Sequence, residues 1–246
     1  MKRALLIVAA MVITLVFTAG AWAEEPLANR LDRLEAKVAR YEAILRYLVV
    51  DTNTINGLRG PHVIFRGANV HIQSGSNATN GLGNLIIGNN EMPGGGPSPT
   101  GPTNRTGSHN LVIGFGHSYS ASGGFVAGTM NSISGQASSV SGGVRNRAIG
   151  QYSSVSGGEH NTASGQAPSV RGGYNNTAVG QNSSVSGGQN STASGSASSV
   201  SGGMGSTASG EFSSVSGGTG NTASGKGSSI LGGSGKVAAT LFQTVP

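Results

Sequence analysis

Hydrophobic residues in the second half of the chain recur at a fixed interval. One aliphatic side chain returns every fifteen residues between residues 140 and 230, and one alanine does the same between residues 148 and 223. The aliphatic positions are Val140, Val155, Val170, Val185, Val200, Val215 and Ile230. The alanine positions are Ala148, Ala163, Ala178, Ala193, Ala208 and Ala223. A period this constant predicts a solenoid, in which each repeat forms one coil that buries its apolar side chains against neighbouring coils.

The period changes upstream of these repeats. Val112 and Val126 lead to Val140 in steps of fourteen residues, and Ile86 precedes Val112 by 26 residues. The wider step fits one coil plus an insertion of about a dozen residues. The proline- and glycine-rich stretch at residues 89–107 supplies that loop. We therefore expect the repeats, with their loop insertion, to span residues 84–235.

Each repeat contains two short alternating segments, such as Ser154-Val155-Ser156 and Thr162-Ala163-Ser164. Because successive side chains of a strand point to opposite faces, the apolar residue is expected to point inward and the hydroxyls outward. Gly157-Gly158 and Gly165 follow these segments and are expected at corners, where the chain needs positive φ or a close backbone approach. The sequence therefore predicts an all-β fold, a parallel β-solenoid with coils of 14–15 residues.

A second hydrophobic period comes before the repeats, in residues 24–51. Apolar residues are spaced alternately by four and three positions, which is the a/d pattern of a coiled coil. The series begins at Leu27 and continues through the expected contacts between chains, Leu31, Leu34, Val38, Tyr41, Leu45 and Leu48. Arg30 and Lys37 at g positions match Glu35 and Glu42 at e positions of a parallel neighbour. We predict a short coiled-coil helix; the alternative is one amphipathic helix packed on its own domain.

Two further segments flank the repeats. Residues 52–83 are expected to form a β-rich connector, because Val63-Ile64-Phe65 and Val70-His71-Ile72 alternate like strands. Residues 236–246 are expected to cap the end of the stack with Leu241, Phe242 and Val245.

The first 23 residues have the pattern of a secretory signal peptide. Lys2-Arg3 precedes an apolar run, and Ala21-Trp22-Ala23 places small residues two positions apart before Glu24. We therefore expect an exported protein at the cell surface or in the extracellular space, with the periplasm as the alternative location. A membrane would be a partner only if the signal stayed uncleaved as an anchor.

Composition changes this picture in one respect. Glycine contributes 43 of 246 residues, against an average of about 7%, which by itself would also suit a flexible linker. A linker has no reason to keep valine, alanine and glycine in constant phase, so the register favours a folded stack. One valine and one alanine per coil form a small core, and burial between chains is therefore expected to add to it.

The repeats resemble the head repeats of trimeric autotransporter adhesins of the YadA-like type. The resemblance rests on Asn110-Leu111-Val112-Ile113-Gly114, on Gly124-Phe125-Val126-Ala127-Gly128, and on the later Ser-Val-Ser-Gly-Gly and Asn-Thr-Ala-Ser-Gly segments. It covers about residues 84–235 and does not include that family's membrane anchor. The resemblance implies a left-handed parallel β-roll, a homotrimer with one roll per chain, and display outside a bacterium, often for binding host or matrix surfaces.

Candidate catalytic groups are scarce. The chain has no cysteine, and only Glu91, Glu159 and Glu211 of its nine acidic residues lie beyond Asp51. No Gly-x-Ser-x-Gly motif occurs among the serines. We therefore expect no enzyme and assign no catalytic, cofactor-binding or metal-binding residue.

Two weaker chemical interpretations stay open. Glu159 and Glu211 are the carboxylates that a polysaccharide-cleaving enzyme would have to use. A metal cluster could form from histidines if the N-terminal strands fold together. The histidines concerned are His62, His71, His109 and His117. His160 follows Glu159 directly, and in an extended segment the two side chains would diverge.

Regular outward hydroxyls form the candidate binding surface. Threonine recurs with the coil period and is expected to build a flat ladder at Thr162, Thr177, Thr192, Thr207 and Thr222. Asparagines of the same repeats are expected to form structural ladders rather than a site. Arg145, Arg147 and Arg171 offer a basic patch for an anionic polysaccharide. The formal charge of +6 is not clustered, so no nucleic acid is expected as a partner.

These observations predict a non-enzymatic, homotrimeric fibrous protein with a structural or adhesive role. Its expected partners are further copies of itself and an extracellular surface such as matrix or polysaccharide, and no cofactor is expected. The alternative is a solenoid that binds ice or another crystal surface through its threonine and serine ladders.

Overall fold

The computed structural model describes residues 26–76, 78–88 and 104–246. The predicted signal peptide at residues 1–23 and most of the predicted loop insertion lie outside these residues. The chain divides into two compact units, Met1–His71 and Ile72–Pro246. Each unit is described on its own.

In its described residues, 26–71, the first unit contains helix α2 (Leu27–Leu45) and an antiparallel hairpin. The helix has no buried residue, and strand β1 (Leu48–Asp51) pairs with β2 (His62–Phe65). Within the described part of the chain, no helix combines the length and apolar character needed to cross a bilayer.

The helix is shorter than the heptad predicts. Leu48 lies opposite Phe65 in the hairpin instead of continuing the helix. The expectation that Leu48 contributes to the coiled coil is therefore wrong, because Val49 and Val50 are β-branched and find strand partners in Ile64 and Val63. The second predicted connector strand, Val70 to Ile72, does not form.

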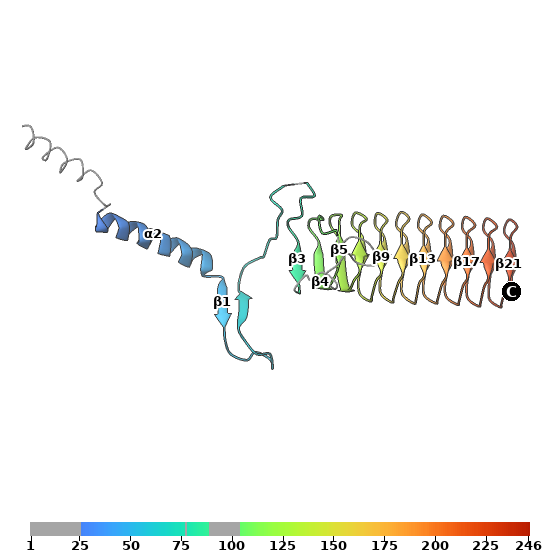
Figure 1. Ribbon diagram of the computed structural model, residues 1–246, viewed down its shortest axis with the longest axis horizontal. Helices are drawn as coiled ribbons and strands as arrows, with labels where there is room; N and C mark the ends of the chain where they lie inside the picture. The colour runs from blue at the N-terminus through green and yellow to red at the C-terminus, as the bar shows by residue number, and fades with distance from the viewer. Residues whose placement is uncertain (1–25, 77, 89–103) are drawn as a thin grey trace, which may run out of the picture. The chain divides into compact units, whose positions relative to one another are not determined.

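The second unit is a solenoid built from two parallel sheets, visible in Figure 1 as a row of stacked strands coloured from green to red. The valine sheet consists of β3 (Leu85–Ile87), β4 (Leu111–Phe115), β6 (Phe125–Thr129), β8 (Ser139–Val140), β10 (Ser154–Val155), β12 (Ser169–Val170), β14 (Ser184–Val185), β16 (Ser199–Val200), β18 (Ser214–Val215), β20 (Ser229–Ile230) and β22 (Thr244–Val245). The alanine sheet consists of β5 (Ser118–Tyr119), β7 (Ser132–Ile133), β9 (Arg147–Ala148), β11 (Thr162–Ala163), β13 (Thr177–Ala178), β15 (Thr192–Ala193), β17 (Thr207–Ala208), β19 (Thr222–Ala223) and β21 (Val237–Ala238). Consecutive strands of the coils alternate between the sheets, which confirms the predicted parallel β-solenoid.

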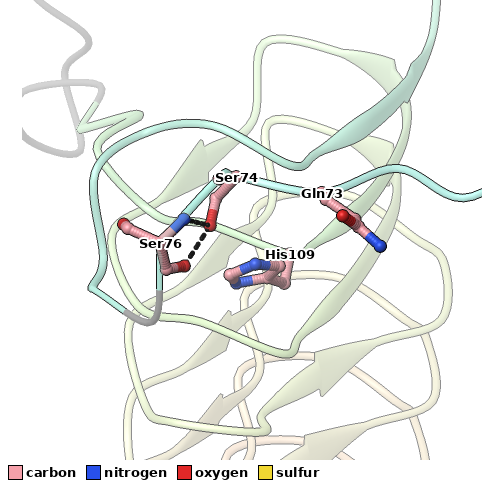
Figure 2. Close-up of a pocket in the computed structure, with 5 residues that line it drawn as sticks. Gln73, Ser74, Ser76 and His109 are labelled. Carbon is pink, nitrogen blue, oxygen red and sulfur yellow. Dashed lines mark hydrogen bonds between the residues drawn. The ribbon is translucent and has the colours of Figure 1, made fainter.

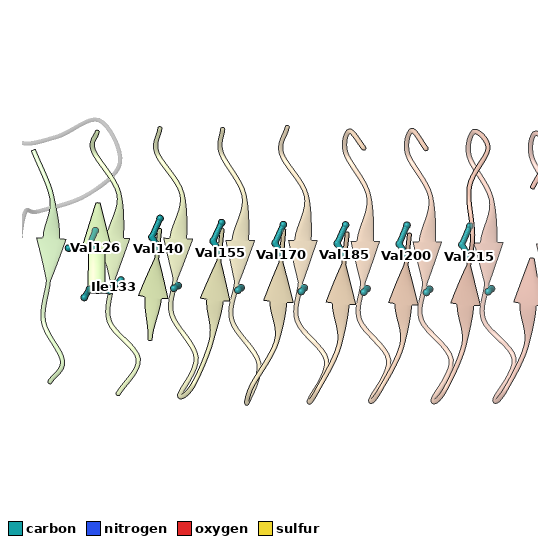
Figure 3. Close-up of a cluster of buried hydrophobic side chains, with 14 of the residues drawn as sticks. Val126, Ile133, Val140, Val155, Val170, Val185, Val200 and Val215 are labelled. Atoms are coloured by element: carbon teal, nitrogen blue, oxygen red, sulfur yellow. The ribbon is translucent and has the colours of Figure 1, made fainter. Parts of the chain in front are cut away.

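The core is a double column of small side chains. The valines of the predicted aliphatic series are at most 1% exposed, and the alanines of the second series are fully buried. Figure 3 shows the labelled valines in line from coil to coil. The coils also bury polar side chains that the sequence did not mark as inward, such as Asn161 and Ser183, whose hydroxyl donates to the carbonyl of Gly180 at 2.8 Å. The interior is therefore half polar, and its stability depends on hydrogen bonds as well as on apolar burial.

A third line of backbone pairing runs along one corner of the solenoid. Single parallel bridges join Val144, Glu159 and Tyr174 in successive coils. The amide of Glu159 donates to the carbonyl of Gly173 at 3.0 Å, and the same bond recurs in the other coils. Every fifteen-residue coil is thus tied to the next along three lines, which fixes the spacing between coils.

The corner glycines differ in what they do. Gly158 has a φ of 80°, and a Cβ on Gly165 would come closer than 3.0 Å to the backbone carbonyls of Val179 and Gly180. Gly157 has neither constraint, since its φ is not positive and a Cβ there would meet nothing within 4 Å. The expectation that the whole glycine pair serves a tight corner is therefore wrong for the first glycine.

The C-terminal residues extend the stack. Strands β21 and β22 pair with β19 and β20 as a further coil of the same two sheets. Val245 packs against the core, whereas Leu241 is 62% and Phe242 is 70% exposed. Leu241 and Phe242 lie at the turn between β21 and β22, and Phe242 has a positive φ, as does Phe212 two coils earlier.

Candidate functional site

The threonine ladder lies on the outer face of the alanine sheet. Thr162, Thr177 and Thr192 occupy directly paired positions in neighbouring strands, and the register continues through Thr207 and Thr222. Because the alanine next to each threonine is buried, the threonine side chain points outward, where it is partly exposed. The ladder is thus a straight row of five hydroxyls with a repeat of about 4.8 Å.

The row has defined limits. Arg147 occupies the equivalent position in the coil before Thr162, and Val237 does so in the coil after Thr222. A parallel outward row of serines accompanies the threonines, but Val179 interrupts it with a side chain that is 45% exposed. The flat hydroxyl surface is therefore confined to the middle and later coils.

The predicted heptad contacts in α2 form an exposed stripe. Leu31, Leu34, Val38, Tyr41 and Leu45 are each 51–59% exposed within one chain. These residues follow the helical period, and the structure places the sixth predicted contact, Leu48, in β1. The single chain therefore leaves an apolar helix face without cover.

Buried asparagines form a hydrogen-bonded ladder inside the solenoid. The backbone amide of Asn161 donates to Oδ1 of Asn146 at 2.9 Å, and Oδ1 of Asn161 accepts the amide of Asn176 at 2.9 Å. The Asn161 Nδ2 donates to the carbonyls of Gly157 and Gly173, both at 3.0 Å. All four hydrogen bonds stay within the stack, so these asparagines are structural, as their period indicates.

Within the described residues, His117 is the first rung of this ladder, although the asparagine pattern of the sequence did not mark it as one. Its Nδ1 accepts the backbone amide of Asn131 at 3.2 Å, and its Nε2 lies 2.9 Å from the carbonyl of Ile113. These partners assign the neutral tautomer with hydrogen on Nε2. The signal was present in the sequence, since His117 precedes Asn131 by one fourteen-residue coil.

The buried imidazole makes the stability of the solenoid depend on pH. Burial, and to a lesser degree the charge of Arg105, hold the pKa of His117 below its ordinary value of 6.5. The unfolded chain therefore takes up this proton at a higher pH than the folded chain. Above about pH 6.5 the ionisation of His117 should not change the free energy of unfolding. Below this pH the free energy of unfolding should fall by up to about 1.4 kcal/mol per pH unit, until the imidazole of the folded chain also protonates.

Urea unfolding between about pH 8 and pH 5 measures this effect. The variant His117→Asn restores the residue of the later coils and should flatten the acid-dependent loss. His160→Asn, at a partly exposed corner, serves as the control and should keep it. An unchanged pH profile for His117→Asn would contradict the prediction.

Charged and aromatic side chains meet at the corner of the solenoid along which the single parallel bridges run, called here the bridge corner. Glu159 Oε1 lies 4.0 Å from Arg145 Nη1 and 3.5 Å from His160 Nε2, and the His160 ring meets Tyr174 edge-on with centroids 5.9 Å apart. The expectation that Glu159 and His160 diverge is wrong, because His160 has a φ of 59° and the segment is not extended there. Their contact is partly exposed and of small energetic weight.

The predicted basic patch is divided. Arg145 lies at the bridge corner and Arg147 on the outer face of the alanine sheet. Arg171 follows the buried Val170 of the valine sheet and is exposed on that side of the coil. The three charges are thus distributed over different sides of the solenoid.

The four histidines do not form a metal cluster. Of the residues that the structure describes, no three histidine or acidic side chains are grouped closely enough to hold an ion. His62 instead contacts the carbonyl of Leu58 at 3.2 Å.

A polar hollow lies at the first coils of the solenoid, and Figure 2 shows His109 facing Gln73, Ser74 and Ser76 across it. The Ser74 hydroxyl donates to the carbonyl of Ser76, so it is engaged within its own loop.

The two carboxylates of the repeats lie at separate corners. Glu159 lies at the bridge corner, where it pairs with Val144 and Tyr174. Glu211 precedes Phe212 at the corner that leads into β18, and it pairs with Lys226 at 2.7 Å. Two carboxylates that flank one scissile bond need to lie within about 10 Å of each other. With three coils and different corners between them, Glu159 and Glu211 do not form such a pair.

No model of a known protein family matches this chain, and no curated protein sequence is significantly similar to it.

Proposed function

We propose that this protein is an exported, non-enzymatic fibrous protein that acts as a homotrimer, with a structural or adhesive role outside the cell. In this proposal the solenoid is a rigid head similar in kind to the YadA-like heads of trimeric autotransporter adhesins. One observation carries the proposal. The inward valines and alanines of the repeat are buried between the coils, and the outward threonines are paired in constant register on a flat face.

The contacts of the polar and acidic side chains support a structural role. Asn161 and its equivalents use their side-chain amides in hydrogen bonds within the ladder. Glu159 lies near Arg145, and Glu211 pairs with Lys226. Long rows of identical side chains suit contact with an extended surface, because many weak contacts together give a high total affinity.

The helix face supports association of chains. A stripe of five large apolar residues that are more than half exposed is costly for a free chain. In a parallel coiled coil the same stripe is buried, and Arg30 and Lys37 of one helix meet Glu35 and Glu42 of the next. Export rests on the signal pattern of residues 1–23.

Sedimentation equilibrium of the purified chain tests the assembly. We expect a mass of three chains for the native protein and a shift to monomer for Leu34→Asp, because a charge at a d position cannot be buried in the seam. Ala36→Asp, which introduces the same charge at the outward f position, should remain a trimer. A native protein that is strictly monomeric at micromolar concentration would contradict the proposal.

Binding to immobilised matrix protein or polysaccharide tests the adhesive role. The Leu34→Asp variant should bind more weakly than the native trimer by a factor of about 100, because simultaneous contacts are lost. Equal binding by both forms would argue against multivalent adhesion.

Ice or crystal binding is the second candidate, favoured by the exact pairing of the five threonines. It predicts thermal hysteresis that disappears when Thr177, Thr192 and Thr207 are replaced by tyrosine. Ordinary freezing behaviour of the native protein, with surface adhesion retained, would exclude this candidate.

A further inference from the structure

One corner of the solenoid carries exposed aromatic side chains on a strained backbone. This corner leads from each alanine-sheet strand to the valine-sheet strand that follows it, and two residues such as Gln151 and Tyr152 form its tip. The second tip position holds the aromatic residues Tyr152, Phe212 and Phe242. They are between 56% and 70% exposed, and their φ values lie between 53° and 58°. This edge of the solenoid is called here the aromatic corner.

The coils do not need aromatic rings at this position. Other coils hold Ala167, Asn182 and Gly227 there, with φ values between 53° and 65°. Glycine and asparagine adopt a positive φ readily, whereas a bulky residue with positive φ is an outlier. An exposed ring at such a position adds strain and buries little apolar surface. Strain of this kind clusters at functional sites, so we expect a ligand for these rings.

The backbone of neighbouring coils holds the rings in place. The amide of Phe242 donates to the carbonyl of Lys226 at 2.9 Å, and the equivalent bond recurs at Tyr152 and Phe212. A Cβ on Gly227 would come closer than 3.0 Å to two atoms of the Phe242 ring, so this ring rests against the corner of the preceding coil. Rings that are already fixed lose little conformational entropy when a ligand binds.

The polar groups beside the rings are uncharged or neutralise each other. The Gln151 Nε2 donates to Gln136 Oε1 at 3.3 Å, which leaves its second amide hydrogen for a ligand. Glu211 and Lys226, the charged residues of the corner tips, pair at 2.7 Å. The corner therefore suits a ligand without net charge. Glutamine recurs at the first tip position of four consecutive coils, Gln136, Gln151, Gln166 and Gln181.

The spacing of the rings fits an extended sugar polymer. Phe212 and Phe242 are two coils apart, and Tyr152 and Phe212 are four coils apart, so their separations along the solenoid are multiples of about 9.6 Å. In an extended β-1,4-linked polysaccharide, alternate sugars turn the same face to one side, at a repeat close to the length of two coils. Each such face consists of C–H groups, which the negative face of an aromatic ring attracts, and the hydroxyls at its rim can bind amides.

We propose that the aromatic corner binds an uncharged β-1,4-linked polysaccharide of the cellulose or chitin type, with sugars stacked on Tyr152, Phe212 and Phe242. The proposal rests on the adhesive role proposed above and gives it a ligand class and a site. Several stacking rings along one rigid edge act together on the same polymer chain, which raises the total affinity.

Co-sedimentation of the purified protein with insoluble polysaccharides tests the ligand class. Microcrystalline cellulose, chitin or both should deplete the protein from solution, and the pattern shows whether the acetamido group of chitin contributes. Granular starch should not deplete it, because α-1,4-linked chains coil and do not present alternate sugars in line. Depletion by starch as strong as by cellulose and chitin would overturn the proposal.

Asparagine substitutions test the rings. The double variant Phe212→Asn and Phe242→Asn should bind the polysaccharide at least about tenfold more weakly. Its melting temperature should stay equal or rise, because asparagine adopts a positive φ more readily than phenylalanine. Phe212→Tyr should keep binding, since Tyr152 occupies the same position. Tyr174→Ala removes an exposed aromatic ring at the bridge corner and is the matched control that should bind like the native protein.

The outcomes separate this site from the adhesive role. Unchanged binding of the double variant, loss of binding in Phe212→Tyr, or equal weakening in Tyr174→Ala would each overturn the aromatic corner as the site. A lower melting temperature of the double variant would show that the rings serve the fold and would also overturn it. A native protein that binds immobilised matrix protein but neither cellulose nor chitin overturns this proposal and leaves the adhesive role intact. Binding to none of these surfaces would contradict both.

Discussion

Replacing Gly165 by alanine is expected to lower the free energy of unfolding by about 3 kcal/mol. A Cβ at this position would come closer than 3.0 Å to the carbonyls of Val179 and Gly180, and both are backbone atoms of the next coil. That coil cannot move away, because three lines of hydrogen bonds fix its distance. Gly180 and Gly195 stand in the same relation to the coils that follow them, so the effect belongs to the repeat and not to one site.

Urea unfolding followed by circular dichroism measures the loss, and hydrogen exchange in the neighbouring coil locates it. Gly157→Ala is the matched control, because a Cβ there meets nothing within 4 Å and φ is not positive. This control should be neutral or slightly stabilising, by up to about 1 kcal/mol, since alanine restricts the unfolded chain. Similar destabilisation at both positions would show that close packing between coils is not what requires Gly165.

The second large effect is expected from Asn161→Ala, which should cost about 3 kcal/mol or more. The change leaves the buried amide of Asn176 without its acceptor and removes one donor each from the carbonyls of Gly157 and Gly173. The Gly173 carbonyl keeps the amide of Glu159. Asn161 and Asn176 are fully buried, so water does not replace the acceptor of the Asn176 amide, and such an unpaired buried group costs about 1–3 kcal/mol. The lost hydrogen bonds to the two carbonyls add about 1 kcal/mol each.

Asn161→Ser provides the comparison for this variant. The chain itself uses serine at this rung in two later coils, and Ser206 Oγ accepts the amide of Asn221 at 3.4 Å there. The serine variant should therefore lose less than half as much stability as the alanine variant in the same urea titration. Equal losses would indicate that the volume of the side chain, and not its hydrogen bonds, matters at this position.

Much of the fold could be predicted from local pattern. The fifteen-residue period of Val155 and Ala163 predicts a parallel solenoid, because a coil that buries one face must present the same residues at the same height in every turn. The outward position of the threonine ladder follows from the alternation of strand side chains. Whether this ladder binds a surface is a question for the proposed experiments.

Other features depend on partners distant in sequence. Leu48 fits the heptad, but the hairpin with Phe65 forms instead, since the a/d spacing does not reveal a strand partner further along the chain. The imidazole of His117 takes the place of an asparagine, which becomes visible only when the coils are aligned by the fourteen-residue step. Gly157 and Gly165 look alike in the repeat, yet only Gly165 faces the backbone of the next coil.

The sequence by itself determined the repeat, its inward apolar columns and the hydroxyl character of its outer faces, because all three follow from periodicity along one strand. The tertiary structure alone decided which polar residues enter the core, which glycines are obligatory and where the helix ends. These depend on the distance between backbones of successive coils, about 4.8 Å, and on hydrogen bonds between groups fifteen residues apart. Such distances arise only when the coils are stacked.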